Sequence, residues 1–283
     1  MTDPLGQSQV LPYIINIDKK KYKFHLISFE KRTRFKQNKS QIQNICDKNN
    51  ISWRPLIYTK NPPLFSTLWD LVKLNQSIKK IGSKTTFDII HCRSYIPAIF
   101  GLKFKKKWNV KMLFDMRGFW ADERVEGGLW NLKNPIYKLV YKYFKKKEKQ
   151  LLLNSNHIIS LTHNGKKNII KLPYFSKLEK DISVIPCCTD LSVFKPVKRD
   201  SSSFTIGYLG SLGTWYLIKE MLVFFKKIKE IIPNSKFHFL TKDNPEIILS
   251  QCKNLGIELK NILIEESDIW NLSLIHISEP TRQ

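Results

Sequence analysis

Short apolar runs and longer amphipathic stretches take turns along the chain. Runs such as FDIIHC and VKMLFD have the length and the β-branched and aromatic content of buried strands. Between them, apolar residues recur every three or four positions, which predicts helices. The predicted strands are Tyr22–Phe29, Trp53–Tyr58, Phe87–Cys92, Val110–Asp115, His157–Leu161, Ile182–Ile185, Phe204–Leu209, Lys236–Leu240 and Ile262–Ile264. The predicted helices are Gln7–Asp18, Lys39–Asn49, Phe65–Lys80, Ile96–Lys106, Pro135–Leu153, Thr162–Lys171 (with a threonine cap), Tyr216–Ile231 and Pro245–Leu255.

This order of elements predicts an α/β protein with parallel sheets and helices on both faces. A polar stretch with proline, charges and three serines, Lys195–Ser203, interrupts the alternation and is typical of a domain boundary. We therefore expect a Rossmann-like domain over residues 1–197, a linker at 198–203 and a second such domain over 204–271.

Charged and small residues gather where predicted strands end. In an open parallel sheet, ligands bind in the crevice outside the carboxyl ends of the strands. In the stretch FDMRGFWADERVEGG, Phe114–Gly128, the residues Asp115–Gly128 are interpreted as the loop that leaves such a strand. Buried charges are costly unless they are paired or bind a ligand. Two interpretations stay open: its acidic residues bind a ligand, or they pair with Arg117 or Arg124 or cap the helix at Trp130.

The turn YLGSLGTW follows the predicted strand Phe204–Leu209 and has glycine at Gly210 and Gly213. Such a glycine lets the backbone approach a phosphate, and the N-terminus of the next helix carries partial positive charge. The turn is neither G-x-G-x-x-G nor a Walker A loop. A phosphate site and a turn that needs glycine only for packing therefore both remain open.

Charge narrows the classes of partner. The 283 residues include 48 Lys and Arg against 24 Asp and Glu, a formal net charge of +24. Such a field attracts nucleic acid, anionic lipid or phosphorylated substrates. A general bias toward Lys, Ile and Asn explains part of this total, but it explains the clustering of the lysines on helices less well.

Cysteine usage and hydropathy exclude other classes. The cysteines are odd in number, and their spacing fits neither a disulfide framework nor a metal site, so we expect free thiols in a cytoplasmic protein. They are Cys46, Cys92, Cys187, Cys188 and Cys252. No apolar run reaches the roughly 18 residues of a membrane-spanning helix, and MTDPLGQSQV lacks the pattern of a signal peptide.

Four stretches together resemble the bacterial family 4 glycosyltransferases, whose fold is called GT-B. Asp3–Ile14 (DPLGQSQVLPYI) resembles the small-residue loop and first helix of their N-terminal domain. Phe114–Gly128 resembles their acceptor-side loop, and Ser183–Pro196 (SVIPCCTDLSVFKP) matches their V-I-P-x-G-V-D-x-x-x-F pattern. Ile206–Tyr216 (IGYLGSLGTWY) matches the strand and glycine loop that open their donor domain.

The resemblance implies two Rossmann-like domains that face each other across a cleft. A nucleotide-sugar, a UDP- or GDP-sugar, would bind mainly to the C-terminal domain, and a glycan or lipid-linked acceptor mainly to the N-terminal one. The sugar would be transferred with retention of configuration, without a metal or another cofactor, in the biosynthesis of cell-surface polysaccharide.

The resemblance also implies three groups of site residues. The catalytic candidates lie on the acceptor side, and no carboxylate nucleophile is assigned among them; they are Asp115, Arg117, Asp122 and Glu123. Small and polar residues of both domains would contact the donor phosphates: Gly6, Gln7, Ser8, Gly210, Ser211 and Gly213. Further residues would form the acceptor side or the edge of the cleft: His91, Arg93, Gly118 and Trp120.

Three positions depart from the family pattern. Many relatives carry histidine in the loop where this chain has DMRG. Cys188 stands where the V-I-P-x-G-V-D pattern has glycine. The bases that contact the diphosphate usually follow the glycine loop, and Lys219 is the one base nearby.

The two ends of the sequence depart further. Only Met1 and Thr2 precede DPLGQS, so we expect the first strand of the domain to be missing. Leu272–Arg282 (LSLIHISEPTR) resembles the translation of a sequencing adapter, so we expect the genuine chain to end near Asn271. The family's two donor-binding glutamates, eight positions apart, are then absent. On this reading the donor domain is incomplete and the chain is inactive, while the full-length form is the enzyme.

The basic segment Ile136–Leu153 (IYKLVYKYFKKKEKQLLL) has apolar residues on one side and lysines on the other. Such a helix either lies on an anionic membrane, peripheral at its cytoplasmic face, or packs on the sheet with a solvated lysine face. A basic nucleic-acid-binding protein is a rival interpretation, but no helix-turn-helix, zinc, RRM or OB signature supports it. A non-catalytic fragment is a further rival interpretation.

Overall fold

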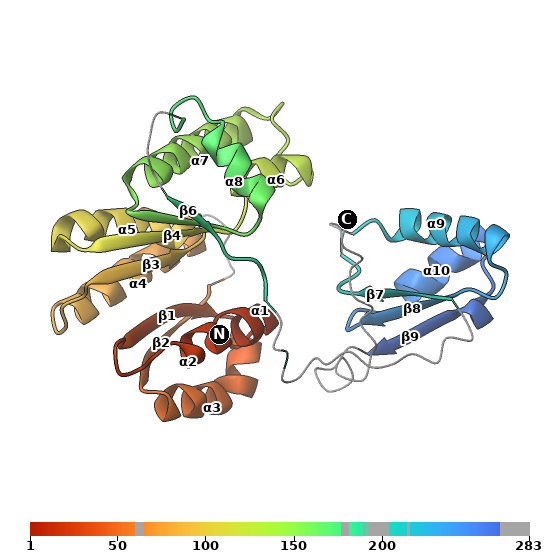
Figure 1. Ribbon diagram of the computed structural model, residues 1–283, viewed down its shortest axis with the longest axis horizontal. Helices are drawn as coiled ribbons and strands as arrows, with labels where there is room; N and C mark the ends of the chain where they lie inside the picture. Colours follow the sequence, from red (N-terminus) through yellow and green to blue (C-terminus); the bar gives the residue numbers. More distant parts are fainter. Residues whose placement is uncertain (60–64, 177–180, 189–190, 192–203, 214–215, 267–283) are drawn as a thin grey trace. The chain divides into compact units, whose positions relative to one another are not determined.

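A computed structural model describes residues 1–59, 65–176, 181–188, 191, 204–213 and 216–266 (Figure 1). The chain divides into two compact units, Met1–Cys188 and Thr189–Gln283. The expected linker at 198–203 and the stretch Leu272–Arg282 lie outside the described residues. Each unit is built from parallel strands that alternate with helices, as the sequence predicts.

The first unit contains two parallel sheets. Its helices are α1 (Pro4–Gln9), α2 (Leu11–Asn16), α3 (Arg32–Lys48), α4 (Phe65–Gly82), α5 (Tyr95–Trp108), α6 (Trp120–Glu126), α7 (Pro135–Asn154) and α8 (His163–Ile170). One sheet pairs β1 (Phe24–Glu30) with β2 (Ile51–Ile57). The other has the order β3 (Ile89–Arg93), β4 (Lys111–Met116), β5 (His157–Ser160) and β6 (Ile182–Val184). β1 and β3 are not paired with each other, and the expected missing strand stays a prediction.

The four-stranded sheet buries one of its faces. Met112, Phe114 and Met116 alternate along β4 and point to the same side, because successive side chains of a strand alternate between faces. Residues of α5, α7 and α8 complete this core, including Ala98, Leu151 and Ile169. On the opposite face, Ile89 and His91 are more than half exposed. The sequence predicted helices on both faces of the sheet, but no described helix covers the sheet at these two positions.

The second unit has one three-stranded parallel sheet in the order β7 (Thr205–Leu209), β8 (Lys236–Thr241) and β9 (Ile262–Glu266). Two helices, α9 (Ile218–Ile231) and α10 (Glu246–Leu255), pack on it, and a 3₁₀ turn, η1 (Leu259–Asn261), precedes β9. Phe225 of α9, Cys252 of α10 and Phe239 of β8 are fully buried in a common core. Gly256 ends α10 in the left-handed conformation that glycine adopts readily (φ +64°).

Three predicted elements need correction. The helix expected at Gln7–Asp18 is two short helices that break at Val10. The helix expected at Lys39–Asn49 begins earlier, at Arg32, so that Phe35 packs edge-on against Trp53 of β2. The stretch interpreted as a loop contains helix α6. The predicted threonine cap is confirmed, because the Oγ1 of Thr162 accepts a hydrogen bond from the N–H of Gly165.

Candidate functional site

Strand register brings four of the predicted site residues together. Arg93 and Asp115 are the last paired residues of β3 and β4 and lie directly opposite each other. His91 lies two residues before Arg93, and Arg117 lies two residues after Asp115. Because side chains alternate between the faces of a strand, His91, Arg93 and Asp115 share one face. They lie at the carboxyl end of the sheet, where the sequence predicts a site.

Asp115 is the centre of this cluster and is only 5% exposed. Its carboxylate oxygens lie 3.6 Å from His91 Nε2, 3.8 Å from Arg93 Nη1 and 3.7 Å from Arg117 Nη1. These separations allow ion pairs but are too long for hydrogen bonds. Asp115 Oδ1 is buried and has no hydrogen-bond partner among the described residues. A buried carboxylate oxygen in this state costs free energy unless a ligand or water donates to it.

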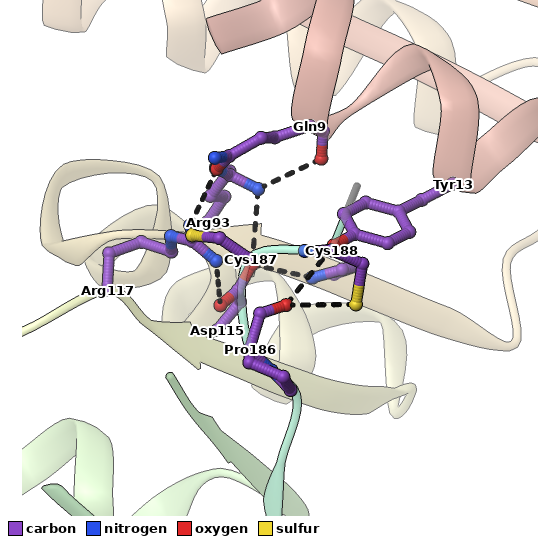
Figure 2. A network of polar contacts seen from close by, with 9 residues as sticks. Gln9, Tyr13, Arg93, Asp115, Arg117, Pro186, Cys187 and Cys188 are labelled. Carbon is purple, nitrogen blue, oxygen red and sulfur yellow. Dashed lines mark hydrogen bonds and ion pairs between the residues drawn. The ribbon is translucent and has the colours of Figure 1, made fainter. Parts of the chain in front are cut away.

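Gln9, at the end of α1, links the two arginines (Figure 2). Its Oε1 accepts hydrogen bonds from Nη2 of Arg93 at 3.1 Å and from Nη2 of Arg117 at 2.9 Å. Its backbone carbonyl also accepts from Nη1 of Arg93. Burial lowers the pKa of Arg93, the positive charge of Arg117 lowers it further, and Asp115 opposes both effects. The two guanidinium groups are therefore close enough to repel each other.

The segment after β6 closes another side of the cluster (Figure 2). Cys187 is exposed, and its sulfur lies 3.5 Å from the Nη2 of Arg117, which donates to it. Tyr13 of α2 donates its hydroxyl hydrogen to the carbonyl of Pro186 and accepts from the N–H of Cys188. Sequence reasoning missed Gln9, Tyr13 and Cys187 as members of this cluster. The available signal was indirect: all three lie inside stretches that carry the family resemblance.

Asp122, another acidic candidate of the same stretch, belongs to a different network. Asp122 of α6 accepts hydrogen bonds from the Tyr141 hydroxyl and from Lys145 Nζ, each at 2.7 Å. Lys145 also donates to the fully buried Glu148, which accepts a further hydrogen bond from the Tyr95 hydroxyl. Burial disfavours the charged form of Lys145, but its hydrogen bonds to Asp122 and Glu148 raise its pKa overall. Asp122 therefore joins α6 to α7 and makes no contact with the Asp115 cluster among the contacts described.

Gly118, Trp120 and Glu123 lie at the turn that joins β4 to α6. Gly118 has a φ of +157°, and a Cβ there would lie 1.9 Å from Glu123 Oε1. Trp120 stacks on Tyr95, and the guanidinium of Arg124 lies 4.5 Å from its ring centroid. Burial raises the pKa of Glu123, and the charge of Glu126 raises it further. In this structure Gly118 and Trp120 shape and anchor the turn.

A family model supplies the identification. The model for Glycosyltransferase Family 4 matches residues 16–193 of the chain. The chain belongs to Glycosyltransferase Family 4. The match covers the Asp115 cluster except for its members in α1 and α2, Gln9 and Tyr13.

Solved structures share the fold of this Family 4 chain. A sucrose-phosphate synthase from Thermosynechococcus elongatus is 14% identical, with a TM-score of 0.58 over 89% of this chain and 72% of that one. Anabaena HepE in complex with UDP is 11% identical, with a TM-score of 0.58 over 95% and 68% of the two chains. A protein described as a UDP-N-acetylglucosamine 2-epimerase, from Listeria monocytogenes, is 15% identical, with a TM-score of 0.53 over 93% and 67%.

These likenesses confirm the GT-B fold expected from the sequence. The Family 4 chain spans 54% and 60% of the length of two further structures that it matches. No curated protein matches its sequence.

The expected donor contacts of the first unit lie inside helix α1. The N–H of Gly6 donates to the side chain of Asp3 at 2.7 Å, and a Cβ on Gly6 would lie 2.6 Å from the Cα of Met1. The side chains of Gln7 and Ser8 bond backbone carbonyls of the same segment. In this structure these three residues therefore stabilise α1, and their contact with a donor stays a prediction.

The glycine turn of the second unit is held by its own hydrogen bonds. The N–H of Gly210 donates to the carbonyl of Leu240, and that of Gly213 donates to Ser211 Oγ. Between them, the N–H of Leu212 donates to Oδ2 of Asp243, which sequence reasoning missed. A phosphate in this turn would have to displace these partners and approach the Asp243 carboxylate. Phosphate binding by Gly210, Ser211 and Gly213 stays a prediction.

The cysteines, the metal-binding side chains and the apolar helices bear on three further expectations. All five cysteines are free thiols, as expected. Among the described residues, no group of three or more His, Cys, Asp and Glu side chains is placed to hold a metal ion. Within the described ranges, no helix is long and apolar enough to cross a membrane.

Proposed function

We propose that the whole protein acts as a glycosyltransferase that moves a sugar from a UDP- or GDP-sugar to a glycan or lipid-linked acceptor, without a metal or another cofactor. The gathering of His91, Arg93, Asp115 and Arg117 on one face of a Family 4 domain carries the proposal. HepE, which shares the fold, was solved with bound UDP, which agrees with a nucleotide-sugar donor. Retention of configuration and a role in cell-surface polysaccharide synthesis are part of the proposal.

The chemistry of the cluster suits the acceptor side of such a reaction. An attacking hydroxyl group must be oriented and must lose its proton as the bond forms. Asp115 Oδ1 is a buried acceptor with no hydrogen-bond partner among the described residues, so it can receive a hydrogen bond from that hydroxyl. Arg93 and Arg117 supply positive charge at a sheet edge, where negative charge of the substrates is stabilised. Asp122 is engaged with Tyr141 and Lys145, and Asp122 and Glu123 would act only through the position of α6.

Release of the nucleotide tests the function. The whole protein is purified and incubated with UDP-glucose, UDP-N-acetylglucosamine or GDP-mannose, together with bacterial membrane lipid and glycan extracts. UDP or GDP release is then measured by a coupled assay, and UDP binding by thermal shift. We expect release that depends on an extract and falls at least about tenfold in Asp115→Asn. The proposal would be overturned if the protein showed no nucleotide binding and released no nucleotide from any donor.

Only part of the segment Ile136–Leu153 is exposed enough to contact a membrane surface. Leu151 and Leu152 are fully buried in the core, so the end of the helix packs on the sheet. In the first half of α7, Ile136 is 68% exposed, Leu139 is 70% exposed and Tyr143 is about half exposed. Their spacing places them on one side of the helix. Exposed lysines alternate with them at Lys133, Lys138, Lys142 and Lys146.

We propose that this half of α7 lies on an anionic lipid surface, with the chain peripheral at the cytoplasmic face of the membrane. Co-sedimentation with phosphatidylcholine vesicles, with and without phosphatidylserine, tests it. Binding should need the anionic lipid and fall in Leu139→Glu, whereas Ile231→Glu, at a 78% exposed position of α9, should bind as well as the unaltered chain. Equal loss of vesicle binding in both variants, or no vesicle binding by the unaltered chain, would refute the proposed membrane-binding surface.

A further inference from the structure

The Asp115 cluster holds more positive than negative charge. Two guanidinium groups, Arg93 and Arg117, share one carboxylate and are tied together by the neutral Gln9. His91 adds a third positive charge only when it is protonated. Burial and mutual repulsion both lower the pKa of Arg93, so the pair is costly in the absence of a further anion. The cluster is therefore one negative charge short of neutrality.

The free donors and the free acceptor of the cluster differ in kind. Each guanidinium has five N–H groups, and most of them have no hydrogen-bond partner among the described residues. Both arginine side chains are partly exposed, so these groups are accessible. Beside them, the Asp115 Oδ1 accepts no hydrogen bond from any described residue. The site thus offers donors for an anion and, next to them, an acceptor for a hydroxyl group.

We infer that the cluster binds the carboxylate of an acidic sugar, a hexuronate unit of the acceptor; this rests on the proposed function. Arg93 and Arg117 take the carboxylate, because guanidinium groups match its two oxygens. A hydroxyl group of the same ring donates to Asp115 Oδ1. A single negative charge restores neutrality. The diphosphate of the donor is the other source of an anion, but when ionised it has no O–H for Asp115 and carries more charge than the cluster lacks.

The Nε–Hε resonances of the arginines, in ¹⁵N-labelled protein, test the inference directly. Methyl β-glucuronoside, methyl β-glucoside and inorganic pyrophosphate are titrated at constant ionic strength. Arg93→Gln and Arg117→Gln assign the two resonances, and Arg32→Gln, at an exposed position of α3, is the matched control. The glucuronoside should shift both resonances, and the glucoside should shift neither. The glucuronoside should bind about tenfold more weakly to either site variant than to the control.

Asp115→Asn separates the two sources of the anion. Loss of the carboxylate should weaken binding of the glucuronoside, because the Asp115 acceptor is lost, and should strengthen binding of pyrophosphate, because a repelling charge is lost. Equal shifts by glucoside and glucuronoside would overturn the inference, and so would tighter binding of pyrophosphate than of glucuronoside to the unaltered chain. Donor turnover is read separately by nucleotide release. Turnover without glucuronoside binding refutes the inference alone, and binding without turnover refutes only the proposed transfer.

Discussion

The stretch Phe114–Gly128 contributes charges to two clusters that are built in opposite ways. In the α6–α7 network, Asp122 and Glu148 accept hydrogen bonds of 2.5 to 2.7 Å from Lys145 and from tyrosine hydroxyls. At the ends of β3 and β4, Asp115 has only ion pairs of 3.6 to 3.8 Å. Both Glu148 and Asp115 are buried. Burial alone therefore does not distinguish the two clusters, whereas the saturation of their hydrogen bonds does.

The difference separates a structural role from a ligand-binding role. A buried carboxylate whose hydrogen bonds are met by its own chain contributes to the position of helices, here α6 against α7. A buried carboxylate with an unused oxygen, next to guanidinium groups with unused N–H groups, is poised for a partner that the chain does not supply. The same rule applies to the glycine turn of the second unit, where Asp243 already occupies the N–H of Leu212.

Glu148→Ala should have the largest effect on stability. The change leaves Lys145 and the buried Tyr95 hydroxyl without one of their partners, which we expect to lower the free energy of unfolding by about 3–5 kcal/mol. Urea unfolding followed by tryptophan fluorescence measures it, since Trp120 lies beside the network. Glu126→Ala removes an exposed carboxyl group at the end of α6 and should cost less than about 0.5 kcal/mol. Equal losses in the two variants would remove the distinction between the clusters.

Asp115→Asn should show the reverse pattern. The Asp115 Oδ1 has no hydrogen-bond partner among the described residues, but the carboxylate lies between Arg93 and Arg117, so its replacement should lower the free energy of unfolding by about 1–2 kcal/mol, less than Glu148→Ala. Transfer activity should fall about 10- to 100-fold, the equivalent of one lost hydrogen bond to a charged group. Urea unfolding and kcat/KM for nucleotide release, measured on the same preparation, check both halves. A destabilisation as large as that of Glu148→Ala, with activity retained, would assign Asp115 to the fold.

Local patterns in the sequence predicted the elements well, because strand and helix periods are local properties. The strands β3 and β4 and the cap at Thr162 were readable from a few neighbouring residues. The α6 helix was missed because the glycines and charges around it are typical of a loop, while its stability comes from packing of Trp120 against Tyr95 and Phe144. Tertiary contacts of this kind leave no local pattern.

The sequence predicted where in the fold the site lies, but not how its residues are arranged. That Asp115, Arg93 and Arg117 lie at a carboxyl strand end follows from the alternation of elements. Their mutual distances depend on the pairing register of β3 and β4, which the sequence does not display. Gln9 and Cys187 come from distant parts of the chain, so no spacing could connect them to Arg117. For the same reason the separation of Asp122 from Asp115 became visible only in the structure.

Gly118→Ala should have an intermediate effect on the turn between the two clusters. The new Cβ would lie 1.9 Å from Glu123 Oε1 at a backbone φ of +157°, so the side chain of Glu123 must move and strain remains. We expect a cost of about 2 kcal/mol in urea unfolding. Gly128→Ala is the matched control, because its φ is +72° but no atom lies within 4 Å of a new Cβ, and should cost about 1 kcal/mol. If Gly128→Ala lowers the free energy of unfolding by as much, the contact with Glu123 does not contribute to the cost of Gly118→Ala.

Glu123→Gln should have the smallest effect, and its sign depends on pH. Burial, followed by the charge of Glu126, raises the pKa of Glu123 above its ordinary value of 4.5. A carboxyl group with a raised pKa binds a proton more readily in the folded protein, so its contribution to stability falls as pH rises through the folded pKa. At pH 7 the variant should therefore unfold at a slightly higher urea concentration than the unaltered chain, and at pH 4 this gain should disappear. Glu220→Gln, at an exposed position of α9, is the control for the loss of one carboxylate away from the turn. A variant less stable at pH 7 than at pH 4, each relative to the unaltered chain, would show that the Glu123 carboxylate stabilises the turn despite its raised pKa.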